Sequence, residues 1–339
     1  MAHCLPETKI VFYKTHKTGS STIQNIMLRY GRNRKLNFAL PAIANQVFPD
    51  GEHPFDEVAR PEGKKSDIYC FHTIPYDEEI IRSVMKETPK WVTVIRQPKE
   101  LFVSFYKYFD LENELQLSMS DFVNLYRTRQ DFLPKNMSLY GPNQMLRDFS
   151  FPSQKMNDTS AVEEFVKGYL DRLFDLVMVV EFMDESLILL RDLLCWDLED
   201  IVYLPINRRM KGGEEDEDLA LLEQIKEINR GDEILYSYFR EKLLAKIEDY
   251  GKERMAEEVR KLTESREAWL KACQFQSRPW YDLPEEYRPY GDSWGYSMGE
   301  NLPDTYRSKC ESLILPELQF IEVIRAEQRL RNGQRGEIW

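Results

Sequence analysis

The sequence predicts an α/β domain with a central parallel sheet. Three short runs of β-branched, apolar and aromatic residues have the continuous apolar character of strands that are buried on both faces: Ile10–Tyr13, Trp91–Ile95 and Leu176–Val180. Asp67–Phe71 is a fourth, weaker candidate. Amphipathic helical patterns alternate with these strands over Ser20–Tyr30, Asp77–Glu87, Pro98–Phe109, Val162–Phe174 and Glu185–Leu194. Such alternation is typical of parallel sheets, whose strands are joined by helical crossovers.

The C-terminal third of the sequence has a different pattern. From about Asp216, apolar residues form narrow stripes on heavily charged segments, which is typical of helices with one buried face. We expect one domain over residues 1–339, with residues 214–277 as a charged helical insertion packed on it. Two further helices, which begin near Tyr306 and Pro316, are expected at the end of the chain.

The charge balance excludes some classes of function. The net charge of −12 argues against a general nucleic-acid binder. Residues 214–264 hold 16 acidic and 9 basic residues, so the other parts of the chain can still form a cationic site. No apolar run is long enough to predict a membrane-spanning helix, and no signal peptide is visible. The five cysteines lack the spacing of a zinc site.

The stretch KTHKTGSST, residues 14–22, joins the first predicted strand to the first predicted helix. Backbone N–H groups at a helix start favour an anion, and Gly19 permits a close approach of the backbone. Lys17 adds positive charge, and the following hydroxyls add donors. The loop therefore predicts a phosphate cradle, although a strand-to-helix turn capped by Ser20 or Ser21 is the simpler alternative.

The loop differs from the GxxxxGK[ST] pattern of ATP-binding phosphate loops. In that pattern a lysine follows the second glycine directly, whereas here Lys17 precedes the single Gly19 by two positions. A kinase that uses ATP and magnesium is therefore an alternative and not our first interpretation.

A second anion site is predicted next to the first. Arg96 lies at the carboxyl end of a predicted strand, which is where open α/β sheets bind ligands. Ser104 lies on the inward face of the next predicted helix. A guanidinium and a hydroxyl that converge suit a second phosphate. The structural alternatives are a buried ion pair for Arg96 and a bond to the helix backbone for Ser104.

These two elements together resemble the nucleotide-binding motifs of sulfotransferases that use 3′-phosphoadenosine 5′-phosphosulfate (PAPS). The sequence is most similar to the Golgi galactose 3-O-sulfotransferase family. The similarity continues through CFHTIPYDEEI, VVEFMDESLILLRDLLCWDLEDIVYLPINRR and WGYSMGENL. The resemblance implies a P-loop-like three-layer fold and sulfuryl transfer without a metal, with adenosine 3′,5′-bisphosphate as the product.

The resemblance also implies roles for individual residues in binding PAPS. The first loop would bind the 5′-phosphosulfate, with Lys17 near the bridging oxygen as a catalytic residue, and Arg96 and Ser104 would bind the 3′-phosphate. The complete predicted donor site is Lys14, His16, Lys17, Thr18, Gly19, Ser20, Ser21, Thr22, Arg96, Ser104 and Arg208.

Sulfuryl transfer needs a base that takes the proton of the acceptor hydroxyl, and histidine is suited to this near neutral pH. His72 follows a predicted strand at the same sheet edge as Arg96, and the family resemblance points to it. We therefore predict His72 as the catalytic base. His16, in the donor loop, is expected to orient the donor or to be structural.

The acceptor implied by the family is the 3-hydroxyl of a β-galactose on a glycolipid or glycoprotein. Sugar sites combine aromatic faces with hydrogen-bonding side chains, and ordinary packing is the alternative for each such residue. The predicted acceptor residues are Tyr76, Tyr140, Asn143, Gln144, Trp294 and Tyr296. A binding protein that holds the nucleotide without transferring sulfate is a further alternative.

The expected compartment follows from the same resemblance. The family implies a type II membrane protein of the Golgi lumen whose membrane anchor is outside this sequence, with no nucleic-acid partner. Asn136 and Asn157 begin possible N-glycosylation sites. In that compartment at least one pair of cysteines is expected to form a disulfide.

Overall fold

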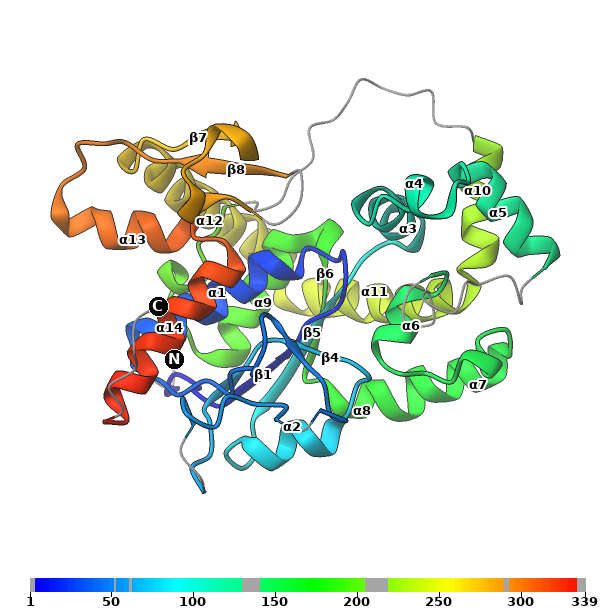
Figure 1. Ribbon diagram of the computed structural model, residues 1–339, viewed down its shortest axis with the longest axis horizontal. Helices are drawn as coiled ribbons and strands as arrows, with labels where there is room; N and C mark the ends of the chain where they lie inside the picture. Colours follow the sequence, from blue (N-terminus) through cyan, green and yellow to red (C-terminus); the bar gives the residue numbers. More distant parts are fainter. Residues whose placement is uncertain are drawn as a thin grey trace.

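The structure is a computed structural model that describes residues 4–51, 53–60, 63–129, 141–204, 219–289 and 293–333. Its centre is a parallel sheet in the order β3-β1-β5-β6 (Figure 1). The strands are β1 (Ile10–Tyr13), β3 (Ile68–Tyr69), β5 (Lys90–Ile95) and β6 (Leu176–Val179). The predicted α/β class with a central parallel sheet is confirmed, whereas the three-layer, P-loop-like arrangement stays a prediction.

Helices follow the strands as the alternation predicted. The first five are α1 (Ser20–Asn33), α2 (Glu78–Val84), α3 (Pro98–Tyr108), α4 (Leu111–Leu115) and α5 (Met119–Thr128). The next four are α6 (Gln144–Asp148), α7 (Thr159–Glu164), α8 (Asp171–Leu173) and α9 (Met183–Leu194). The last five are α10 (Leu219–Ile228), α11 (Arg230–Tyr250), α12 (Lys252–Ala272), α13 (Asp304–Ile314) and α14 (Glu317–Arg331).

Several predicted helices differ slightly in bounds from those of the structure, and two of the differences have a clear local cause. The helix expected over Asp77–Glu87 is shorter, because the side chain of Asp77 caps its start and Met85 has an extended backbone. The helix expected over Val162–Phe174 is interrupted by a π-helical segment, Phe165–Leu170, between α7 and α8.

Two small sheets accompany the central one. Strand β2 (Gln46–Val47) pairs in parallel with β4 (His72–Thr73), so that His72 lies opposite Gln46. Strand β7 (Gln276–Pro279) pairs in antiparallel fashion with β8 (Trp294–Ser297). The first of these sheets places His72 near the end of β1, where the predicted donor loop (residues 14–22) begins.

The charged segment after residue 214 is joined closely to the sheet. Helix α11 packs against β6, and Leu235, Phe239 and Leu243 belong to the main hydrophobic core. Helix α12 packs against α9. Whether residues 214–277 are an insertion into a single domain stays a prediction, but α11 is part of the core and not only a solvated flank.

Helix α14 is anchored against the N-terminal half of the chain. Arg325 forms a buried ion pair with Asp56, and Arg329 contacts the same carboxylate at 2.9 Å. The amide of Gln328 accepts from the backbone of Phe38 at 2.9 Å and donates to it at 3.0 Å. These contacts fix the helix whose first residue, Glu317, reaches the donor loop.

Two disulfides join distant segments, Cys4 to Cys195 and Cys273 to Cys310, and Cys70 is a buried thiol. The prediction of at least one disulfide is confirmed. Among the described residues, no helix has the length and apolarity to cross a membrane. Nor does this part of the chain bring together three histidine, cysteine or acidic side chains that could hold a metal ion.

Candidate active site

The loop after β1 turns sharply before α1 begins. Lys17 and Gly19 both have left-handed backbone conformations, with φ of 59° and 73°. A Cβ atom on Gly19 would lie 2.8 Å from the Val180 side chain, so a larger residue would require movement there. Glycine supplies both the torsion and the close approach to the neighbouring segment. The structure therefore explains why position 19, on which the predicted anion cradle depends, is a glycine.

Several hydroxyls of the loop are used to hold its own shape. Thr15 Oγ1 donates to the carbonyl of Val94 at 2.6 Å and contacts Thr18 Oγ1 at 2.8 Å. Ser20 Oγ donates to the carbonyl of Thr15 at 2.6 Å. The side chains of Thr18, Ser20 and Thr22 are buried. Hydroxyls that the sequence assigned to the donor thus have a role in fixing the loop.

Lys14 is buried beneath the first turn of α1. Its ammonium contacts Gln24 Oε1 at 2.8 Å and Ser21 Oγ at 3.2 Å, and it forms an ion pair with Glu317. Ser21 also donates to Glu317 at 2.8 Å. Burial raises the pKa of Glu317, but Lys14 and the hydrogen bonds from Ser21 and Asn45 outweigh it and lower the pKa. The Lys14 charge is therefore compensated by a carboxylate from α14.

Two other cationic side chains lie at the loop. The Lys17 ammonium is 3.3 Å from the centre of the Tyr108 ring, a cation–π contact. Arg96 donates to the carbonyl of Lys17 at 3.1 Å, and its nearest carboxylate, Glu100, is 3.9 Å away. Burial lowers the pKa of Arg96, against the opposing effects of Glu100 and Glu181. The structure thus brings Arg96 to the donor loop, and half-buried Ser104 lies on the helix that follows.

Two histidines stack at the same point. The rings of His16 and His72 have centroids 4.1 Å apart and an interplanar angle of 17°. His72 is only 8% exposed. Burial, followed by the nearby His16 and Lys14, lowers the pKa of His72 well below its usual range. This environment therefore favours the neutral form of His72, because a charge on its ring would be both desolvated and repelled.

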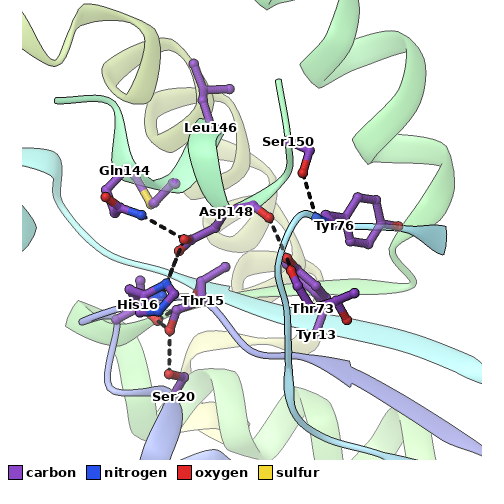
Figure 2. A network of polar contacts seen from close by, with 12 residues as sticks. Tyr13, Thr15, His16, Ser20, Thr73, Tyr76, Gln144, Leu146, Asp148 and Ser150 are labelled. Carbon is purple, nitrogen blue, oxygen red and sulfur yellow. Dashed lines mark hydrogen bonds and ion pairs between the residues drawn. The ribbon is translucent and has the colours of Figure 1, made fainter. Parts of the chain in front are cut away.

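Asp148, at the end of α6, binds His16 twice (Figure 2). Its carboxylate accepts from the backbone N–H of His16 at 2.7 Å and lies 2.7 Å from Nδ1 of the ring. Because an ionised carboxylate is only an acceptor, Nδ1 must carry the proton, which leaves the lone pair of a neutral ring on Nε2. A carboxylate in this position also stabilises the imidazolium form. Asp148 is not among the site residues that the sequence predicts.

A cavity of about 250 Å³ opens beside the histidines. His16, His72, Tyr76 and Asp148 line it together with Arg147, Ser150 and neighbouring residues of the segment after α6. The backbone N–H of Tyr76 donates to Ser150 Oγ at 2.6 Å (Figure 2). The cavity combines aromatic surface with polar side chains, which are the two components of a sugar site.

The remaining predicted acceptor residues have different surroundings. Asn143 and Gln144 are buried, with exposed fractions of 2% and 1%, and bond to α10, α11 and Asp148. Trp294 and Tyr296 lie on β8, and Tyr296 packs near Phe275. Neither of these two lines the cavity. The predictions for Tyr140, Arg208 and Asn136 lie outside the described residues, and Asn157 is exposed.

Comparison with known proteins identifies the family. The sequence profile described as galactose-3-O-sulfotransferase matches residues 1–328. Galactosylceramide sulfotransferase of Mus musculus is 30% identical over 346 residues, which cover 94% of this chain and 78% of that protein. Galactose-3-O-sulfotransferase 4 of Homo sapiens is 27% identical over 408 residues, which cover 96% and 84%. Galactose-3-O-sulfotransferase 3 of Homo sapiens is 26% identical over 354 residues, which cover 96% and 79%. The chain therefore belongs to the galactose-3-O-sulfotransferase family, and it is a carbohydrate sulfotransferase.

Proposed function

We propose that this protein transfers the sulfuryl group of PAPS to the 3-hydroxyl of a β-galactose carried by a glycolipid or a glycoprotein. The observation that carries this proposal is the meeting of three features at one sheet edge. The donor loop, the stacked pair His16 and His72, and the 250 Å³ cavity adjoin one another. The donor loop and the cavity share His16, so a donor and an acceptor can meet across that side chain.

The proposed donor site follows the charges of the loop. The backbone around Gly19 and the start of α1 bind the 5′-phosphosulfate, since helix N-termini favour anions. Arg96 and Ser104 bind the 3′-phosphate. Lys17 stabilises the charge that develops on the leaving phosphate. Lys14 contributes less directly, because its ammonium is already paired with Glu317.

We propose His16 as the proton acceptor. From the sequence we predicted His72, and no observation tests that prediction directly. The contacts favour His16, because Asp148 stabilises a proton on its ring, whereas burial and the neighbouring cations oppose a proton on His72. His72 then serves as the neutral ring against which His16 stacks.

The proposed reaction is a group transfer in which no atom is oxidised or reduced. The acceptor oxygen attacks sulfur in line with the leaving group, and a new S–O bond forms as the bond to the 5′-phosphate oxygen breaks. The proton of the acceptor hydroxyl passes to His16. The products are a sulfate ester and adenosine 3′,5′-bisphosphate. The proposal includes no metal.

The proposal is tested with the purified protein, radiolabelled PAPS and a panel of galactosides. We expect transfer to β-galactosides and none to 3-deoxy-galactosides. In a thermal-shift assay, adenosine 3′,5′-bisphosphate should stabilise the protein, whereas ATP with magnesium should not. Stabilisation by ATP with magnesium alone would support the kinase alternative, and nucleotide binding without transfer to any galactoside would support the inactive binding protein.

We also propose the Golgi lumen as the compartment. Its support is the pair of disulfides, which persist in oxidising compartments, together with the exposed Asn157. Mass spectrometry of the protein from a secretory expression system should find both disulfides and a glycan on Asn157. Five reduced cysteines and an unmodified Asn157 would contradict this location.

A further inference from the structure

We infer that the junction between α10 and α11 positions the catalytic base: Asn229, Gly231 and Asp232 hold the short helix α6, and α6 holds Asp148 against His16. The inference rests on the proposed role of His16 and extends it to residues more than 200 positions away in the sequence. Asn229, Gly231 and Asp232 touch neither the donor loop nor the cavity in the described contacts, so they are positioning residues and not catalytic ones.

The junction and α6 cap one another. The Asp232 carboxylate accepts from the backbone N–H groups of Met145 and Leu146, both at 3.0 Å. In return, Asn143 Oδ1 accepts from the backbone N–H of Asp232 at 2.9 Å. Asn229 Oδ1 accepts from the backbone N–H of Asn143 at 2.8 Å. The start of each helix therefore satisfies backbone donors of the other.

Helix α6 needs this support from outside. It has only five residues, and Asn143, at its start, has a left-handed backbone and makes no capping bond of its own to the helix. A helix of this length is marginal on its own, since few of its backbone groups find intrahelical partners. In its ionised form the Asp232 carboxylate at its N-terminus also matches the helix dipole, although burial raises the pKa of this group to about 7.

The packing leaves little room for an alternative arrangement. Asp232 is fully buried, and Asn143 and Asn229 are 2% and 1% exposed. A Cβ atom on Gly231 would lie 2.6 Å from Leu146 Cδ1 and 3.0 Å from Asn143 Oδ1. A substitution at Gly231 would therefore force the side chains of Leu146 and Asn143 to move, and Asn143 Oδ1 is the acceptor for the Asp232 N–H.

Three hydrogen bonds connect α6 to the base. Gln144 Nε2 donates to Asp148 Oδ1 at 2.8 Å, and the Asp148 carboxylate then binds both the backbone and the ring of His16 (Figure 2). A second contact fixes the same turn, because Tyr13 donates its hydroxyl to the carbonyl of Asp148. A shift of α6 by even 1 Å would lengthen the Asp148 to His16 contact beyond hydrogen-bonding distance.

This chain of contacts gives Asn143 and Gln144 a specific role. Both were predicted from the sequence as acceptor-binding residues. Their side chains are instead directed to Asp232, to the carbonyl of Ile228 and to Asp148. The inference assigns them to the support of Asp148.

The test compares Asp232→Asn, Asp232→Ala and Gly231→Ala with a matched control, Glu241→Gln, an exposed position on α11. We expect the first three to lower kcat by about tenfold or more, because general acid–base catalysis depends on the geometry of the base. The KM for PAPS and the affinity for adenosine 3′,5′-bisphosphate should change by less than about threefold. Glu241→Gln should match the wild type in all three measurements.

A spectroscopic readout keeps the test independent of activity. In protein labelled with ¹⁵N-histidine, the Nδ1 proton of His16 should give a downfield signal that disappears in His16→Asn and in Asp148→Asn. We expect the signal to be lost or broadened in Asp232→Ala and Gly231→Ala, and retained in Glu241→Gln. Asp232→Asn keeps the size of the side chain, so it can replace Asp232→Ala in this measurement if Asp232→Ala does not fold.

The outcomes separate this inference from the proposed function. An unchanged His16 signal and unchanged kcat in folded Asp232 and Gly231 variants would overturn the inference, whatever the substrate is. If the wild-type protein transfers no sulfuryl group, the proposed function fails, and the His16 signal still decides whether the junction positions the base.

Discussion

Lys14 and His16 are two residues apart in the donor loop, and each is bound by a carboxylate from a distant part of the chain. Glu317 reaches Lys14 from the start of α14, and Asp148 reaches His16 from the end of α6. The first pair is an ion pair between a lysine and a glutamate, and it is buried on the lysine side. The second pair joins a carboxylate to an imidazole, a ring that can accept a proton as well as donate one.

This difference separates two tasks of the loop. The Lys14 and Glu317 ion pair joins the start of the loop to α14, and buried contacts such as that of Arg325 with Asp56 hold α14 in place. The His16 and Asp148 pair can hold a proton and release it again, so it suits the chemical step. Lys17, which lies over the Tyr108 ring, and Arg96, which donates to the carbonyl of Lys17, are the cations that we propose for donor binding.

The largest effect is expected at Lys17. Lys17→Ala removes the only loop cation proposed to act on the leaving phosphate, so transfer should fall by about 10³-fold or more. Lys14→Ala is the comparison, because it removes the cation that forms the ion pair with Glu317. Rates are measured with saturating PAPS after circular dichroism confirms folding. Turnover within tenfold of wild type in Lys17→Ala would exclude Lys17 from the chemical step.

Arg96→Ala should act on donor binding more than on the chemical step. Losing charge-assisted hydrogen bonds to the 3′-phosphate should cost about 2–4 kcal/mol, or about 30- to 1000-fold in affinity for adenosine 3′,5′-bisphosphate. Isothermal titration calorimetry measures this loss directly. As a control, adenosine 5′-phosphosulfate, which has no 3′-phosphate, should bind both proteins with similar affinity. Full affinity of the variant for the bisphosphate would remove Arg96 from the donor site.

Breaking the ion pair between Lys14 and Glu317 should lower the free energy of unfolding. Glu317→Gln leaves the buried ammonium of Lys14 uncompensated, which should cost about 3 kcal/mol. Adding Lys14→Met should restore most of that loss, because both charges are then absent. Glu327 lies on the same helix as Glu317 and forms a more exposed ion pair with Arg32. Glu327→Gln, which breaks that pair, should cost about 1 kcal/mol or less. Urea unfolding of the four proteins supplies the values, and equal losses at Glu317 and Glu327 would contradict the comparison.

The smallest effect concerns His72 and pH. The pKa of His72 is lowered in the folded protein. Below about pH 6.5, His72 therefore binds a proton in the unfolded chain but stays neutral in the folded protein. Stability due to this residue should therefore fall as the pH drops from about 6.5. His72→Gln should lose less stability than the wild type between pH 7 and pH 5. Parallel stability curves for the two proteins over this range would show that His72 is not held neutral.

The sheet and the donor loop could be predicted from the sequence because their signals are local. A run such as Ile10–Tyr13 is apolar along its whole length, and the glycine and lysine of the loop lie within a few residues of it. Arg96 could be placed because the carboxyl ends of parallel strands share one edge of the sheet.

The carboxylates of the site could not be predicted in the same way. Asp148 and Glu317 meet their partners only through tertiary contacts, across 132 and 303 positions of sequence. Neither belongs to a motif with fixed spacing. For Asn143, which we predicted as an acceptor residue, the direction of the polar side chain depends on partners such as Asp232 that lie elsewhere in the chain.

The most direct test of the account compares His16→Asn with His72→Asn in single-turnover transfer from PAPS to a β-galactoside. The account predicts that His16→Asn slows the chemical step by about 10²–10⁴-fold while the affinity for adenosine 3′,5′-bisphosphate stays within about threefold of wild type. His72→Asn should slow it less, because that ring stacks on the base and does not take the proton. Near-normal transfer by folded His16→Asn, with His72→Asn inactive, would contradict the account and make His72 the base.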